Sequence, residues 1–234
     1  MLLELFGKYQ SGSVQFTDLL IGALLTMIVV MFSLSFHEFA HGYVAYRLGD
    51  PTADRMGRLT LNPIAHLDPV GTICMLLFGF GWAKPVPVST RFFRKPKRDM
   101  ALTAFAGPVS NILLAFICLL IYRLLILAFG NVSLPSEFVY YIVLYTIELF
   151  KHGHVLNLYL AVFNLIPIPP LDGSRLLFIF LPDKYYFGLM KYEQIIKIVF
   201  FVLLCTNKLS LPLSNICNDI SYIMDLIISF IPGL

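Results

Sequence analysis

Charged residues are scarce in this sequence of 234 amino acids. Lys, Arg, Asp and Glu make up 13% of it, whereas about 25% is usual for a soluble domain. Hydrophobic residues account for 58%, the mean hydropathy is +0.80, and the net charge of +3 is too small to indicate nucleic-acid binding. The composition excludes an ordinary soluble domain and predicts an integral membrane protein in a lipid bilayer.

Several other features are missing. The sequence has no internal repeat, Gly/Ser linker, acidic tail or low-complexity tract, so we expect a single membrane domain over residues 1–234. The N-terminus has neither a basic segment nor a small-residue cleavage site, so no removable signal peptide is expected. Cysteines never occur as C-x-x-C, which argues against a disulfide framework or a cysteine-based zinc site. We interpret all four as small buried apolar residues: Cys74, Cys118, Cys205 and Cys217.

Long apolar runs define the expected helices. A hydrocarbon core about 30 Å thick requires roughly 20 helical residues, and residues 17–46 and 101–128 meet this length as the first and second spans. Residues 70–83 form a shorter run with three glycines. We therefore expect a re-entrant or β-strand segment near 70–90, buried against protein.

The later part of the chain is less regular. Because Lys151 at mid-bilayer would be costly, the sequence predicts a break at 151–154 and a third helix that starts near His154. Two further apolar stretches, near 193–206 and 216–232, bring the expected total to about five transmembrane helices, within a range of four to six. The predicted fold class is a mainly α polytopic membrane protein.

Basic residues set the expected orientation. Nine of the 17 Lys and Arg residues fall within residues 47–98, and the positive-inside rule makes this loop cytoplasmic. The first helix then runs inward, the second outward and the third inward. This topology returns Asp172 to the cytoplasmic side, where His37 and His41 also lie.

The segment "SLSFHEFAHGYVAYRLGD", residues 33–50, places polar side chains at the end of the first apolar run. His37 and His41 are four residues apart and share one helix face, while Glu38 is placed to act on a water molecule rather than to bind the metal. This H-E-x-x-H pattern is typical of zinc hydrolases. The alternative is a pair of packing histidines with a salt-bridged glutamate, which is expensive near the bilayer.

Catalytic zinc requires a third protein ligand and an open position for water. Asp172 lies in "NLIPIPPLDGSR", where three prolines interrupt helical hydrogen bonding, and such backbone at membrane depth faces protein or a wet cavity. Asp172 is therefore the preferred candidate, although it could instead cap a helix that starts at Gly173. His66 is the rival ligand, and His152 and His154 are expected on the opposite face as surface residues.

Four segments together resemble a known family. They are "HEFAHGYVAYRLGDPTADRMGRLTLNPIAHLDPVGT", "GWAKPVPV", "AGPVSN" and "FNLIPIPPLDG". The chain resembles the site-2 protease family of intramembrane zinc metalloproteases, peptidase family M50, in its short form without PDZ or CBS domains. The resemblance covers residues 33–181, and we place the catalytic core at about 17–181. One departure follows "KPVPV", where Ser89-Thr90 replaces the Asn-Pro of many relatives and affects a substrate-facing loop.

The resemblance implies a zinc-dependent endopeptidase that cleaves membrane-spanning or membrane-adjacent protein segments in regulated intramembrane proteolysis. It implies a bacterial cytoplasmic membrane, an active site open to the cytoplasm, and one Zn²⁺ per chain. The implied residues are the ligands His37, His41 and Asp172, the catalytic Glu38, and Asn111 and Asn164 as substrate or oxyanion contacts. For both asparagines, interhelical hydrogen bonding is an equal alternative.

Two other functions use the same residues. A membrane metal-binding or transport protein accounts for the three ligands but gives Glu38 no role. A catalytically inactive scaffold would be indicated by a missing histidine or glutamate, and none is missing.

Overall fold

The structure is a computed structural model that describes residues 15–78, 83–130, 132–182, 184, 188, 191–205 and 210–231. The described residues are mainly helical and include no β-strand. Three long helices dominate: α2 (Phe16–Arg47), α6 (Pro96–Phe129) and α7 (Glu137–Asn164). The shorter elements are α3 (Thr52–Arg55), α4 (Pro63–His66), α5 (Pro69–Phe78), the 3₁₀ helix η1 (Thr90–Phe92), α8 (Asp172–Phe180), α10 (Glu193–Cys205) and α11 (Ser210–Ser229).

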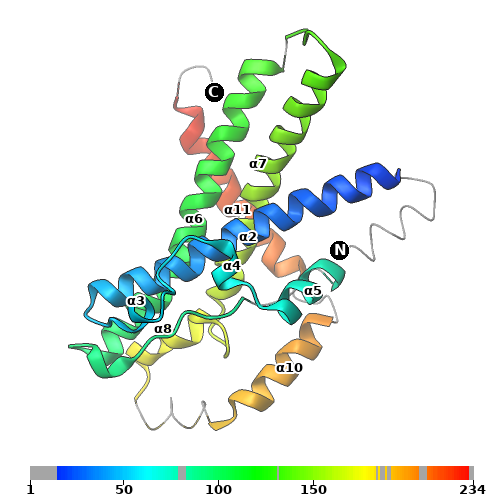
Figure 1. Ribbon diagram of the computed structural model, residues 1–234. Helices are drawn as coiled ribbons and strands as arrows, with labels where there is room; N and C mark the ends of the chain where they lie inside the picture. Colours follow the sequence, from blue (N-terminus) through cyan, green and yellow to red (C-terminus); the bar gives the residue numbers. More distant parts are fainter. Residues whose placement is uncertain are drawn as a thin grey trace.

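Helices α6 and α7 lie side by side, and α2 crosses them (Figure 1). Helix α8 packs against α6, and α11 packs mainly against α7. A buried apolar cluster joins α6, α7 and α11: Ala115, Leu119, Leu158, Val162, Cys217, Met224 and Ile228. This packing fixes α6 and α7 relative to each other, and the polar side of α2 packs against both helices.

The two predicted spans are confirmed as helices. Helices α2 and α6 contain 32 and 34 residues, so at 1.5 Å per residue they are about 48 and 51 Å long and exceed the hydrocarbon thickness. In the described part of the chain, these two helices are long and apolar enough to cross a membrane. The predicted total of about five membrane helices stays a prediction.

The end of α2 is fixed by a glycine. Gly49 has φ +107°, and its N–H donates to the carbonyl of Tyr46 at 3.0 Å while Asp50 N–H donates to that of Ala45 at 2.9 Å. This is the Schellman arrangement, which favours glycine because of the positive φ. The chain therefore turns sharply after Arg47 and packs α3 and α4 back against α2.

Of the two alternatives predicted for residues 70–83, the β-strand was wrong over the part that is described, while the re-entrant segment stays a prediction. Residues Pro69–Phe78 form the helix α5 rather than sheet-like backbone, while residues 79–82 lie outside the described part. The carboxylate of Asp68 accepts a 2.8 Å hydrogen bond from Gly71 N–H, and Pro69 takes the first helical position. Asp followed by Pro is a helix-start signal, and here it outweighs the glycine content. Residues 83–89 run in an extended course that is not paired as a strand.

The predicted break at 151–154 was also wrong. Helix α7 continues without interruption from Glu137 to Asn164. The prediction rested on the cost of placing Lys151 at mid-bilayer. In the structure the side chain of Lys151 is 54% exposed, lies 3.5 Å from the Glu148 carboxylate, and borders an open pocket of about 280 Å³ with several polar neighbours: Arg123, His154, Ser221 and Asp225. A helix can carry a lysine where the neighbouring elements supply polar partners.

The two C-terminal apolar stretches form helices close to their predicted positions. The stretch near 193–206 forms α10, and the stretch near 216–232 forms most of α11. Cys74, Cys118 and Cys217 are free thiols, and the last two are buried as expected; the side chain of Cys205 lies outside the described part.

Candidate metal centre

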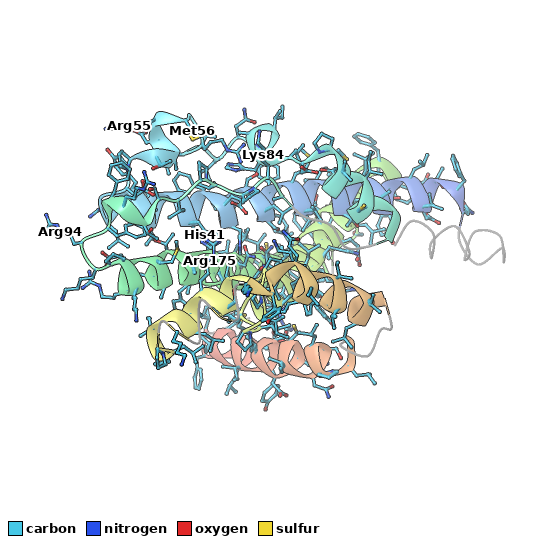
Figure 2. The ribbon with its side chains drawn as sticks, turned by 90° about the horizontal axis from the view of Figure 1, so that it is seen from below. His41, Arg55, Met56, Lys84, Arg94 and Arg175 are labelled. Atoms are coloured by element: carbon cyan, nitrogen blue, oxygen red, sulfur yellow. The ribbon has the colours of Figure 1, made fainter. Side chains whose placement is uncertain are left out.

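Two histidines on α2 form the first half of the centre. His37 and His41 are 5% and 8% exposed, and their imidazole rings meet edge to face at 4.6 Å between centroids. The ring nitrogens His37 Nε2 and His41 Nε2 are 3.0 Å apart. In Figure 2, His41 lies on the side of α2 that faces α6 and α8, whereas Arg55 and Lys84 lie on its other side.

Asp172 supplies the third group, at the first residue of α8. Its Oδ2 lies 3.0 Å from His37 Nε2 and 3.1 Å from His41 Nε2. The N-cap of α8 is Leu171, and the cap makes no side-chain hydrogen bond. The Asp172 carboxylate therefore points at the histidines rather than capping the helix.

The donor set fits a zinc ion. A tetrahedral zinc with ligands at about 2.0–2.1 Å places its ligand atoms about 3.3–3.4 Å apart. The separations of 3.0, 3.0 and 3.1 Å among the three facing atoms come within a few tenths of that value. Among the described residues, His37, His41 and Asp172 are the one group of three or more metal-binding side chains close enough to hold an ion.

Hydrogen bonds from α6 orient both imidazoles. His41 Nδ1 lies 2.7 Å from the backbone carbonyl of Thr103, which can only accept, so Nδ1 carries the proton and Nε2 presents its lone pair. Asn111 is fully buried, and its side-chain amide lies 3.2 Å from His37 Nδ1. A metal-bound Nε2 requires Nδ1–H as a donor. Asn111 Oδ1 is buried and has no hydrogen-bond partner. Turning the amide by 180° exchanges its oxygen and nitrogen, and Oδ1 then accepts the hydrogen bond that His37 Nδ1–H donates.

Gly107 brings the backbone of α6 against the two rings. A Cβ atom at this position would lie 2.6 Å from Cε1 of His37 and closer still to Nε2 of His41. Only glycine leaves room for both imidazoles beside this turn of α6. Gly107 was not among the predicted site residues, and the signal available in the sequence was a glycine inside an apolar helix.

Glu38 is half-buried beside the histidines. Its Oε2 accepts a 2.7 Å hydrogen bond from the backbone N–H of Val86, in the extended segment that precedes η1. A carboxylate next to a three-ligand metal site can accept and return a proton during hydrolysis.

The remaining candidates lie elsewhere. The ring of His66 is buried, with Nε2 2.7 Å from the carbonyl of Thr60, and it is not part of the metal-binding group. Asn164 is half-buried, and its amide donates to Leu160 O within α7 at 2.9 Å. His152 is exposed as predicted, whereas the surface position predicted for His154 was wrong.

Two residues of α7 make buried hydrogen bonds that the sequence did not predict. His154 is 6% exposed and bonds the carbonyl of Ala115 at 3.0 Å and Ser221 Oγ at 2.8 Å. Asn157 is 1% exposed and donates to Ser33 Oγ of α2 at 2.9 Å. Polar residues within an apolar helix were the available signal, because they must find partners in the bundle.

Fold and site together describe a helical protein with two helices that are long and apolar enough to cross a membrane, and with two histidines and an aspartate that could hold a metal ion beside a glutamate. Three protein ligands with a neighbouring glutamate are the arrangement of a metallohydrolase. Comparison with known proteins names the family: the model of peptidase family M50 matches residues 25–206. The chain belongs to this family and is a zinc metalloprotease.

Curated relatives agree. The chain is 45% identical over 186 residues to "Putative zinc metalloprotease YwhC" of Bacillus subtilis, covering 77% of this chain and 80% of that protein. It is 32% identical over 154 residues to "Putative zinc metalloprotease MJ0611" of Methanocaldococcus jannaschii, covering 66% and 69%. Identity to "Zinc metalloprotease MJ0392" of the same organism is 27% over 168 residues, covering 72% and 37%. No significant match to a solved structure was found.

Proposed function

We propose that this zinc metalloprotease is an intramembrane endopeptidase that cleaves transmembrane or membrane-adjacent segments of protein substrates, as in regulated intramembrane proteolysis. The observation that carries the proposal is the place of the metal centre. His37 and His41 are buried on a 32-residue apolar helix, and Asp172 reaches them from a helix packed against the second apolar span. A protease restricted to soluble substrates has no need to build its centre inside such helices.

The residue roles belong to this proposal. His37, His41 and Asp172 would hold one zinc ion, which when bound would supply a Lewis acid to polarise the scissile carbonyl and activate water. Glu38 takes a proton from the water whose oxygen bonds to the carbonyl carbon. It then delivers that proton to the amide nitrogen as the C–N bond breaks.

Substrate or oxyanion contacts by Asn111 and Asn164 stay predictions. Asn111 is fully buried and touches His37, which favours a role in orienting that imidazole. Asn164 is half-buried at the end of α7, eight residues before Asp172, and is therefore the better placed of the two to meet an extended substrate.

We place the site on the cytoplasmic side of the bacterial cytoplasmic membrane. The basic residues of 47–98 support this orientation. His37 precedes Arg47 by ten residues, which at 1.5 Å per residue puts it roughly 15 Å below that boundary. Water then enters from the cytoplasm. We further propose a single domain over residues 1–234 with its core at about 17–181, and about five membrane helices.

A membrane metal transporter is the competing function for this centre. It uses the three ligands equally well, but it gives no reason for a carboxylate at position 38. Replacing Glu38 with glutamine separates the two functions, because an amide cannot accept the proton of water.

The experiment compares membrane proteins that accumulate uncut in cells carrying wild-type protein, Glu38→Gln, or the control Glu148→Gln. Glu148 lies on α7 in an exposed pair with Lys151. We expect Glu38→Gln to retain zinc and to lower cleavage by roughly 10²–10⁴-fold, while Glu148→Gln cleaves normally. Cleavage at the wild-type rate by Glu38→Gln would refute the proposed function.

A further inference from the structure

The segment 83–89 lies against α2 at Glu38 and Gly42, and two prolines set its course. Pro85 and Pro87 have φ fixed near −65°, and each pushes the residue before it into extended backbone. Neither proline has an N–H group. Val86 therefore carries the single main-chain donor of the Pro-Val-Pro triplet, in a conformation that its neighbours impose.

The main-chain donors of this segment have distinct acceptors. Lys84 N–H donates to the carbonyl of His66 at 2.9 Å, and Ser89 N–H donates to Oδ2 of the buried Asp50 at 2.6 Å. Between these two anchors, Val86 N–H donates to Oε2 of Glu38 at 2.7 Å. The segment is thus held at both ends by groups outside the metal centre, and its middle donor is directed at the carboxylate.

The side chain of Val86 fixes that donor in place. It is 8% exposed, and a Cβ atom built on Gly42 would lie 3.2 Å from its Cγ1 atom. Gly42 is four residues after Glu38, so both lie on the same face of α2. Because Gly42 has no side chain, the Val86 side chain can pack directly against α2. This packing brings the Val86 N–H to the carboxylate of Glu38, which lies one helical turn before Gly42.

We propose that the main-chain N–H of Val86 is the positioning group for the Glu38 carboxylate, and this inference rests on the proposed role of Glu38 as proton carrier. The hydrogen bond occupies Oε2 and fixes the direction of the carboxylate, so that Oε1 is left to exchange the proton with water and substrate. A general base works best when a further group holds its side chain in one orientation toward the reacting atoms. A donor to an ionised acceptor is also among the stronger hydrogen bonds in proteins.

Proline substitution tests the donor directly. Val86→Pro removes the N–H that Glu38 accepts, and Val88→Pro removes an N–H that makes no described bond two residues later in the same segment. We expect Val86→Pro to lower kcat for a membrane substrate by roughly ten- to hundredfold with KM and zinc content close to wild type. Val88→Pro, which keeps the Val86 N–H and the Val86 side chain, should retain most of kcat. Equal kcat in Val86→Pro and Val88→Pro, both loaded with zinc, would overturn the proposal.

Amide hydrogen exchange provides a readout that needs no proteolysis. In the full-length zinc-loaded protein, the Val86 amide should exchange more slowly than that of Val88. In Glu38→Ala it should exchange roughly tenfold faster or more, while the Ser89 amide, bonded to Asp50, stays protected as an internal control. An unprotected Val86 amide in the wild type would refute the contact even if the protein is an active protease. A protected amide in a protein that cleaves nothing would instead refute the proposed function.

Discussion

Gly107→Ala should damage the metal centre without touching a ligand. The added Cβ would lie 2.6 Å from His37 Cε1, whereas ordinary contact begins at 3.4 Å, so the helix or the ring must yield by 0.8 Å, the difference of the two. A contact closer still forms with His41 Nε2, the atom that faces the centre. Zinc sites tolerate deviations of only about 0.2 Å from ideal ligand distances. We therefore expect zinc affinity to fall by roughly 10- to 100-fold, the range seen when the supporting shell of a metal site is disturbed.

The matched control is Gly22→Ala, the same substitution in α2 at a position where the new Cβ meets nothing within 4 Å. Because alanine favours helix over glycine by about 1 kcal/mol, this variant should bind zinc normally and melt no lower than wild type. The assay is competition for zinc against a chelator in detergent solution, with elemental analysis of the purified protein. If Gly107→Ala binds zinc as tightly as Gly22→Ala, the close approach of α6 to the two imidazoles is refuted.

Two further predictions concern the ligands and the topology. His37→Ala and His41→Ala each remove one of three donors, and Asp172→Asn replaces a carboxylate by a weaker amide ligand, so each variant should lose most bound zinc by elemental analysis. Full zinc and normal cleavage in Asp172→Asn would refute its role as a ligand. A topology reporter inserted within 91–98 should read as cytoplasmic and one within 130–136 as external, and the reverse result would turn the catalytic helix round in the membrane.

The two membrane-length helices, and the three side chains that meet at the candidate metal centre, could be predicted from the sequence for physical reasons. Apolar length alone identifies α2 and α6, because a membrane demands about 20 helical residues. His37 and His41 follow from helical periodicity, and Asp172 followed from charge topology and a proline-rich break. The distances between these three groups agree with that expectation.

The errors have a common origin, which is that a lone residue was judged without its tertiary partners. The charge of Lys151 predicted a break in α7, but the side chain is exposed beside Glu148 and borders an open polar pocket. His154 was expected at the surface, but Ser221 of α11, 67 residues later, completes its hydrogen bonding. Local pattern contains no information about such distant acceptors. The same holds for Gly107, whose importance depends on which rings lie opposite it.

The continuous helix α7 also has a consequence for the order in which the protein is made. His41 and Asp172 are 131 positions apart, and the whole of α6 and α7 must be synthesised between them. At about 5–20 residues per second, this takes about 7 to 26 s. During that interval the nascent chain holds two donors and cannot complete the three-donor centre that catalytic zinc requires. A chain truncated before Asp172 should therefore insert α2, α6 and α7 yet retain no zinc. On the ligand assignment proposed above, the newborn enzyme has no complete metal centre, and so no protease activity, until Asp172 has been added to the chain.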